Sequence, residues 1–292
     1  MATISQSSEH RGYELDDRTL KVIRQPKLSI HAAVTGLQNL VRFRGLLYAL
    51  TVMRLHVRYK QSILGWLWAV LQPLSLMLLY TFVFSTVTSI RTEGIPYPVF
   101  VFSGLLPWVF FSSAITTSTS GLVSQSYLLT RVYFPREIIP FSYVAAAFVD
   151  FLIASGIFAG LLFYYRIPMT RTALVAVPIM WCLVLFATAV ALLLSALQAR
   201  FRDIGVAMPL LIQLWMFATP VVYPLSAIPN RFRPICMANP MAGLIESFRE
   251  AILKGRVSDG TTLAYSAVSA CAFFIGCYIA FKNLDANMAD FI

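Results

Sequence analysis

The sequence is poor in charged residues. Asp, Glu, Lys and Arg make up 12% of its 292 residues, against roughly 25% in an average soluble domain. Beyond Lys60, the charges leave five long uncharged stretches and a sixth that only Asp150 interrupts. The uncharged stretches are 61–90, 94–130, 172–199, 204–230 and 260–281, and the interrupted one is 138–165. Since about 20 mainly apolar residues form a helix long enough to cross a membrane, this pattern excludes a soluble protein and predicts a polytopic protein of the inner membrane.

Catalytic motifs are missing as well. The chain has no Gly-x-x-x-x-Gly-Lys-Ser/Thr phosphate-binding loop, so it is not itself a P-loop ATPase. Its three histidines, His10, His31 and His56, lie far apart near the N-terminus, and no predicted span holds a pair of carboxylates. An integral membrane enzyme needs clustered acids or histidines near the membrane interface. We therefore expect no catalytic residue and no bound cofactor in this chain.

The sequence also shows no sign of a metal site or of a disulfide framework. It has only four cysteines, and no two of them show metal-ligand spacing. Three of the four, Cys182, Cys271 and Cys277, fall inside predicted spans. We interpret the cysteines as small apolar core residues and expect no metal.

Positive charge is present, and its position indicates the topology. Of the 23 Lys and Arg, 10 lie in the first 60 residues, and cytoplasmic flanks of membrane spans carry such an excess. The polar N-terminus lacks the short apolar core of a cleavable signal peptide. A basic protein can also bind nucleic acid, but the apolar stretches argue against a nucleic-acid partner.

These features predict an all-α integral membrane protein with both termini in the cytoplasm. Residues 1–37 are expected to form a cytoplasmic tail, residues 38–60 an amphipathic interface helix, and residues 61–292 a six-span domain. The spans are expected at about 63–90, 99–119, 138–165, 173–197, 204–223 and 263–281, with an outer segment at about 224–259. On this topology 15 Lys and Arg flank the spans on the cytoplasmic side and 8 on the outer side, which is the expected asymmetry.

The segment before the first span has the pattern of an amphipathic helix. Its apolar residues recur in steps of three and four, which places them on one helical face. They are Leu40, Phe43, Leu47, Leu50, Met53 and Val57, and Arg42, Arg44, Arg54 and Arg58 fall between them. A basic helix of this kind beside a first span lies in the membrane interface, or it packs on a partner in the cytoplasm.

Two connections between spans also have helical patterns. Residues 120–137 suit a short helix that lies flat on the cytoplasmic side and ends before Pro135. In the outer segment, Asn239 and Pro240 form a typical helix start. An apolar stripe follows them, opposite a polar face: the stripe is Met241, Leu244, Ile245, Phe248 and Ile252, and the polar face is Glu246, Arg249, Glu250 and Lys254. We expect a pair of short re-entrant or interfacial helices here, with a surface loop domain as the alternative.

One ionisable side chain, Asp150, lies well inside a predicted span. A carboxylate at this depth is costly and is a functional candidate, as a proton site or a substrate contact. The alternative is an interhelical hydrogen bond or ion pair that fixes the packing of the span.

Six motifs, in a fixed order over roughly residues 50–255, resemble those of polysaccharide-exporting ABC permeases. They are VRYKQSILGWLWAVLQP (57–73), FSGLLPW (102–108), VYFPRE (132–137), LQARFRD (197–203), PVVYP (220–224) and NPMAG (239–243). The match is closest to the O-antigen and teichoic-acid class of type-2 permeases. One departure from the family is Leu55-His56, where an acidic-aliphatic pair is expected, and it leaves the contacts of the interface helix open.

The resemblance implies a homodimer of six-span subunits in membrane lipid, with one cytoplasmic ABC ATPase, carrying ATP and Mg, bound to each subunit. It implies export of a lipid-linked polysaccharide through a channel at the dimer interface. It assigns ATPase coupling to residues 120–137, with Gln125, Tyr127, Arg131, Tyr133, Phe134, Arg136 and Glu137 as the candidate residues. The interface helix would act through Arg54, Arg58, Tyr59 and Lys60, and the outer gate through Tyr223, Pro224, Asn239, Pro240, Glu246 and Arg249.

Aromatic side chains suit a polysaccharide channel, because they stack weakly on the C–H faces of sugars and leave no deep binding well. The candidates for lining residues are Trp66, Tyr80, Phe84, Trp108 and Phe110. The alternative function is a secondary transporter driven by an ion gradient. That class shows internal repeats and several intramembrane charges, whereas this sequence shows a single carboxylate and no repeat.

Overall fold

The computed structural model describes residues 41–60, 62–84, 94–131, 134–256 and 260–287, and all structural statements below concern these residues. They form helices and connections, with no β-strand among them. The α-helices are α2 (Arg44–Tyr59), α3 (Trp68–Val83), α4 (Tyr97–Thr119), α5 (Gly121–Ser124), α6 (Ser126–Arg131), α7 (Ile138–Tyr164), α8 (Ala176–Arg200), α9 (Asp203–Ala218), α10 (Arg233–Ala238), α11 (Pro240–Arg249) and α12 (Gly260–Asn287). The expected tail 1–37 and residues 85–90 of the expected first span lie outside the described residues.

Five helical segments are long and apolar enough to cross a membrane. They are Gly65–Val83, Tyr97–Thr119, Ile138–Tyr164, Arg171–Arg200 and Leu263–Asp285. The expected span at 204–223 corresponds to α9, which has 16 residues and is therefore about 24 Å long, shorter than a hydrocarbon core of about 30 Å. The chain leaves helical geometry at Thr219, whose backbone is extended. By length and composition the described chain thus holds five of the six expected spans.

Helix α4 is the centre of the bundle. It packs against α3, α7, α8, α9 and α11, and most of its side chains are buried. Its sequence is apolar on every side, as is typical of a helix with neighbours all round. Aromatic rings join it to α8 and α9: Phe111 stacks on Phe186 at 5.5 Å and meets the edge of Trp215 at 5.1 Å. This core fixes the positions of the polar groups at the two ends of the bundle.

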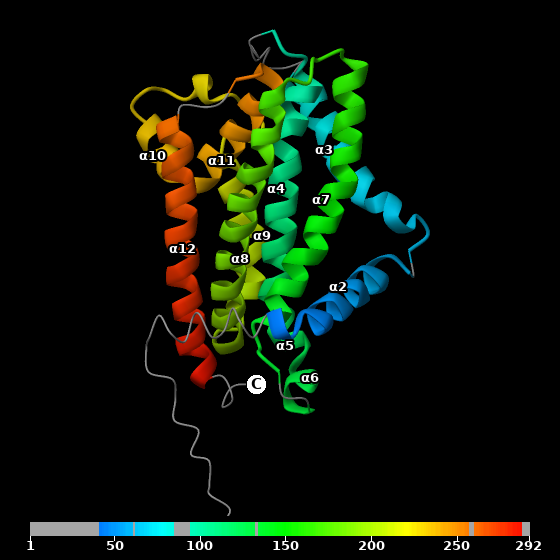
Figure 1. The fold of residues 1–292 in the computed structure, drawn as a ribbon, viewed down its shortest axis with the longest axis vertical. Coiled ribbons are helices and arrows are strands. Elements are labelled where there is room, and N and C mark those ends of the chain that lie inside the picture. The colour runs from blue at the N-terminus through cyan, green and yellow to red at the C-terminus, as the bar shows by residue number, and fades with distance from the viewer. Residues whose placement is uncertain (1–40, 61, 85–93, 132–133, 257–259, 288–292) are drawn as a thin grey trace, which may run out of the picture.

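The two ends carry different short helices (Figure 1). Helices α2, α5 and α6 lie at one end, and α10 and α11 lie at the other. Helix α12 runs along the bundle and packs on α8 and α11. The cytoplasmic and outer segments expected from the sequence therefore lie at opposite ends of the molecule.

The interface helix forms as expected, and its buried face matches the expected apolar stripe in part: Leu50 is buried, and Phe43 and Leu47 pack beside it. Met53 and Val57, which the sequence pattern assigns to the apolar stripe, are 40% and 74% exposed. The buried residues of the helix, which packs on α7, are Leu50, from the expected stripe, and Thr51, Arg54, Leu55 and Tyr59. From Met53 onward the buried face is rotated relative to the expectation, since three polar side chains, Arg54, Arg58 and Tyr59, bind residues of α7.

Candidate functional site

The expected cytoplasmic helix is divided into two short helices, α5 and α6, that meet at Gln125. Gln125 is half-buried, and Tyr127 on α6 is 66% exposed. Phe134, at the start of the following segment, is buried beside Leu50 and Leu122. Tyr133 and the side chain of Arg131 lie outside what the structure describes. The loop therefore offers an exposed surface on α6 while Phe134 anchors it to the bundle.

Arg136 and Glu137 connect this loop to α12. Arg136 Nη1 lies 3.2 Å from Asp285 Oδ1. Glu137 is completely buried, and its Oε1 accepts hydrogen bonds from Lys282 Nζ at 2.7 Å and from the Tyr278 hydroxyl at 3.3 Å. The other carboxylate oxygen has no partner among the described residues. These two candidate coupling residues thus bind the last turns of α12.

Asp150 joins the interface helix to α7. One of its carboxylate oxygens pairs with the Arg58 guanidinium, and the other accepts a hydrogen bond of 2.7 Å from the Tyr59 hydroxyl. Burial, together with the neighbouring carboxylate, raises the pKa of Tyr59 to about 12, so this hydroxyl stays a donor at physiological pH. The structure therefore shows the interhelical ion pair that was the alternative role for Asp150.

Arg54 makes a second connection to α7. Its Nε donates a 2.7 Å hydrogen bond to Ser142 Oγ, and its guanidinium lies 3.3 Å from the centroid of the Tyr143 ring. Burial lowers the pKa of Arg54, and the contact with Tyr143 opposes that shift. Lys60, the remaining candidate of this helix, is exposed. Two arginines of α2 thus point into the bundle, a placement that the amphipathic pattern does not predict.

The candidate lining aromatics lie in different environments. Trp66 is exposed and stacks on Tyr59 at 4.6 Å. Tyr80 and Phe84 are half-buried and lie 6.2 Å apart. Trp108 and Phe110 are buried inside this single chain, at 3% and 2% exposure. In this conformation these two face the core of their own chain and present no surface to a second copy.

In the outer segment, helix α11 begins where the sequence predicts. The Asn239 side chain accepts a hydrogen bond of 3.1 Å from the Met241 backbone N–H, and Pro240 is the first helical residue. The Asn239 amide also donates to Thr219 Oγ1 at 2.9 Å, which fastens this cap to the end of α9. The predicted apolar stripe is buried: Met241, Leu244, Ile245, Phe248 and Ile252. Tyr223 donates to the Phe217 carbonyl, and Pro224 is buried.

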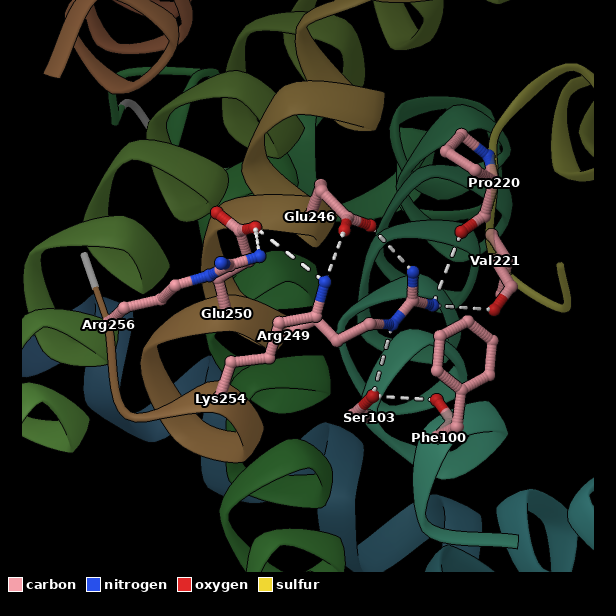
Figure 2. A network of polar contacts seen from close by, with 9 residues as sticks. All are labelled: Phe100, Ser103, Pro220, Val221, Glu246, Arg249, Glu250, Lys254 and Arg256. Atoms are coloured by element: carbon pink, nitrogen blue, oxygen red, sulfur yellow. Dashed lines mark hydrogen bonds and ion pairs between the residues drawn. The ribbon is translucent and has the colours of Figure 1, made fainter. Parts of the chain in front are cut away.

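Arg249 is another residue whose position differs from the sequence pattern. It belongs to the expected polar face of α11, yet it is 0% exposed. Figure 2 shows its guanidinium enclosed by groups from three segments. Glu246 Oε2 lies 2.8 Å from Nη1, the Val221 and Pro220 carbonyls lie 2.9 and 3.3 Å from Nη2, Ser103 Oγ lies 3.4 Å from Nε, and the Phe100 ring centroid lies 4.0 Å away.

Ion pairs extend from Arg249 along the same helix. Lys254 lies between Glu246, at 4.0 Å, and Glu250, at 3.7 Å, and Arg256 reaches Glu250 at 3.3 Å (Figure 2). The i,i+4 pair of Glu250 and Lys254 is the one expected from spacing. We call Glu246, Arg249, Glu250, Lys254 and Arg256 the outer network. It fixes α11 to the beginning of α4 and to the turn after α9.

The comparison with protein families decides the class of this bundle. The sequence profile of the ABC-2 type transporter family matches residues 45–253. The chain belongs to the ABC-2 type transporter family. The matched range begins in α2 and ends within the outer network. It contains the polar clusters described above except the residues of α12, Lys254 and Arg256.

Among similar proteins, the O-antigen export system permease protein RfbA of Myxococcus xanthus is 35% identical to this ABC-2 chain over 169 residues, which are 57% of this chain and 64% of that protein. The protein of the same name from Klebsiella pneumoniae is 32% identical over 167 residues, with the same coverage. The polysialic acid transport protein KpsM of Escherichia coli is 26% identical over 237 residues, covering 78% of this chain and 89% of that protein. The match spans less than two thirds of the length of the RfbA proteins.

Proposed function

We propose that this ABC-2 chain is the permease subunit of an ATP-driven exporter that moves a lipid-linked polysaccharide across the cytoplasmic membrane. Two copies would form the channel, and each would bind one cytoplasmic ABC ATPase that carries ATP and Mg. The family match and relatives named for O-antigen export and polysialic acid transport support this proposal. The observation that carries it is the separation of a cytoplasmic helical loop and an outer helical segment at the two ends of one bundle (Figure 1).

The topology in this proposal has six membrane crossings, with both termini in the cytoplasm. Helix α9 would make the fifth crossing together with the non-helical residues that follow it, since 16 helical residues are too few alone. The end of the bundle with α2, α5 and α6 faces the cytoplasm, because the excess of Lys and Arg lies there. The outer network then lies on the far side of the membrane.

In this proposal the exposed surface of α6 receives the movement of the ATPase. The movement reaches α12 through the ion pairs of Arg136 and Glu137 with Asp285 and Lys282. Helix α12 packs directly on α11, which carries Arg249. In this proposal a continuous set of contacts connects the ATPase-binding end of the bundle to the outer segment. The outer network would hold the outer end of the channel closed.

Capture of the ATPase tests the proposal directly. The tagged chain is purified from its native membranes, and the stoichiometry of bound ATP-hydrolysing subunits is measured. Two permease copies with two ATPases are expected. A stable protein that never retains an ATPase would refute the proposal.

The Asp150→Asn variant separates the proposal from a transporter driven by a proton gradient. Under the proposal, Asp150 carries no transported proton, and asparagine keeps an oxygen that can accept from Tyr59, so a folded variant is expected to keep ATP-dependent export that needs no proton gradient. A proton-coupled transporter would lose transport while keeping its fold. Retention of the variant at wild-type levels in the membrane is the control for folding.

A further inference from the structure

A polar cavity of about 310 Å³ lies where α2, α3, α4 and α7 meet. Its lining includes both members of the Arg58–Asp150 ion pair and the polar residues Tyr59, Gln72, Ser113 and Thr117. The aromatic residues Trp68, Phe110 and Phe151 also line it. The cavity lies in the half of the bundle that carries the interface helix, because the last turns of α4 line it.

Several polar groups of this cavity have spare hydrogen-bonding capacity. Within the described parts of the chain, the Gln72 amide and the Ser113 hydroxyl have no side-chain partner. Arg58 uses one nitrogen for Asp150, and its side chain keeps 32% exposure. Each oxygen of Asp150 accepts one bond, from Arg58 or Tyr59, and a carboxylate oxygen can accept a second. Donors and acceptors therefore converge on the same space, which is the pattern of a binding pocket for a polar ligand.

The charge of the lining selects the class of ligand. Arg58 and Asp150 cancel each other, and no other ionisable group with a charge at neutral pH lines the cavity. A phosphate or diphosphate would meet the Asp150 carboxylate without a second cation to offset the repulsion. A neutral sugar suits the lining better, since its hydroxyls can donate to Asp150 and accept from Arg58 and Gln72, while the aromatic wall contacts its C–H face.

The size of the cavity suits a single sugar unit. Its volume of about 310 Å³ lies at the lower end of the range for small-molecule pockets, about 300–1,000 Å³. We propose that this cavity binds one neutral saccharide unit of the lipid-linked glycan on the cytoplasmic side, before the polymer enters the channel. The identity of the glycan as substrate rests on the proposed function, whereas the saccharide chemistry rests on the cavity itself.

The test measures binding of octyl β-glucoside, below its micellar concentration, to the full chain in phospholipid nanodiscs. The variants are Gln72→Leu and Ser113→Ala, because neither side chain has a partner whose loss would unfold the protein. The matched control is Gln213→Leu, an exposed glutamine on α9 that lies outside the cavity. Octyl phosphate, with the same alkyl chain, is the probe for a phosphate site.

Saturable glucoside binding is expected in the wild type and in Gln213→Leu. Each cavity variant should weaken it by about tenfold, the effect of one lost hydrogen bond to a well-placed group. Unchanged glucoside affinity in both cavity variants would overturn the proposal. So would tighter binding of octyl phosphate that depends on Gln72 or Ser113, since the cavity would then be a phosphate site. Failure to capture an ATPase, with glucoside binding intact, would refute the exporter function and leave the saccharide site standing.

Discussion

Replacing Arg249 by methionine should be among the most destabilising single changes in the outer segment. The guanidinium is 0% exposed and contacts Glu246, Ser103 and the carbonyls of Pro220 and Val221. Methionine fills a similar length but donates no hydrogen bond. The change leaves Glu246 without its closest cation and leaves two buried carbonyls without a donor from this side chain (Figure 2).

The magnitude follows from burial. Removing one partner of a buried ion pair costs about 3–5 kcal/mol, because the remaining charge is left without compensation. Lys254, 4.0 Å from Glu246, offsets part of that loss, so we expect about 3 kcal/mol. Arg256 provides the matched control: it also pairs with a glutamate of this segment, at 3.3 Å, but its side chain is 62% exposed. An exposed pair contributes about 0–1 kcal/mol.

The assay is unfolding of the purified chain in mixed micelles titrated with SDS, which gives the difference in free energy of unfolding between variants. Arg249→Met should unfold at clearly lower SDS than the wild type, and Arg256→Met close to the wild type. Arg249→Lys should fall between them, because lysine keeps the charge but not the forked geometry that reaches several acceptors. Equal stabilities of Arg249→Met and Arg256→Met would refute the assignment of Arg249 as the centre of the outer network.

Three further predictions concern other contacts. Gly104→Ala should lower stability by about 1–3 kcal/mol, since a Cβ there would lie 2.6 Å from the buried Arg249 guanidinium. The control is Gly156→Ala, where a Cβ would have nothing within 4 Å. It should have little effect in the same SDS titration. Lys282→Met should lower stability and uncouple ATP hydrolysis from export, because it removes the cation beside buried Glu137; hydrolysis that still responds to substrate would contradict the coupling path through α12. For Tyr59, the folded pKa of about 12 lies above the ordinary value of 10, so its contribution is complete below pH 10 and is lost as the pH rises through 12. Replacing Tyr59 by phenylalanine should therefore change the free energy of unfolding by the same amount at every pH between 6 and 9.

Local chemistry accounts for the features that the sequence predicts well. The uncharged stretches identify long apolar helices, because a membrane helix satisfies its own backbone hydrogen bonds and needs only apolar side chains. The start of α11 is predictable because the Asn239 cap and Pro240 act within one turn of the chain. The Glu250–Lys254 pair is likewise set by helical spacing alone.

The interface helix shows where local reasoning ends. Periodicity places Met53 and Val57 on the packed face, yet both are exposed. Arg54 and Tyr59 face the bundle instead, since their partners Ser142 and Asp150 lie on α7, 88 and 91 residues away in the sequence. The hydrophobic pattern cannot predict such contacts, because it places every arginine on the exposed face of its helix.

The uncharged stretches and the helix-start signal predict a helical membrane protein, its long apolar segments and the residue at which α11 begins. The shortness of α9, the rotation of α2 and the burial of Arg249 are visible only in the folded structure. The physical reason is the same in the last two cases: a polar side chain can be buried only where distant segments bring their oxygen atoms to it. Ser103 is 146 residues from Arg249, and no pattern within either helix records that they meet.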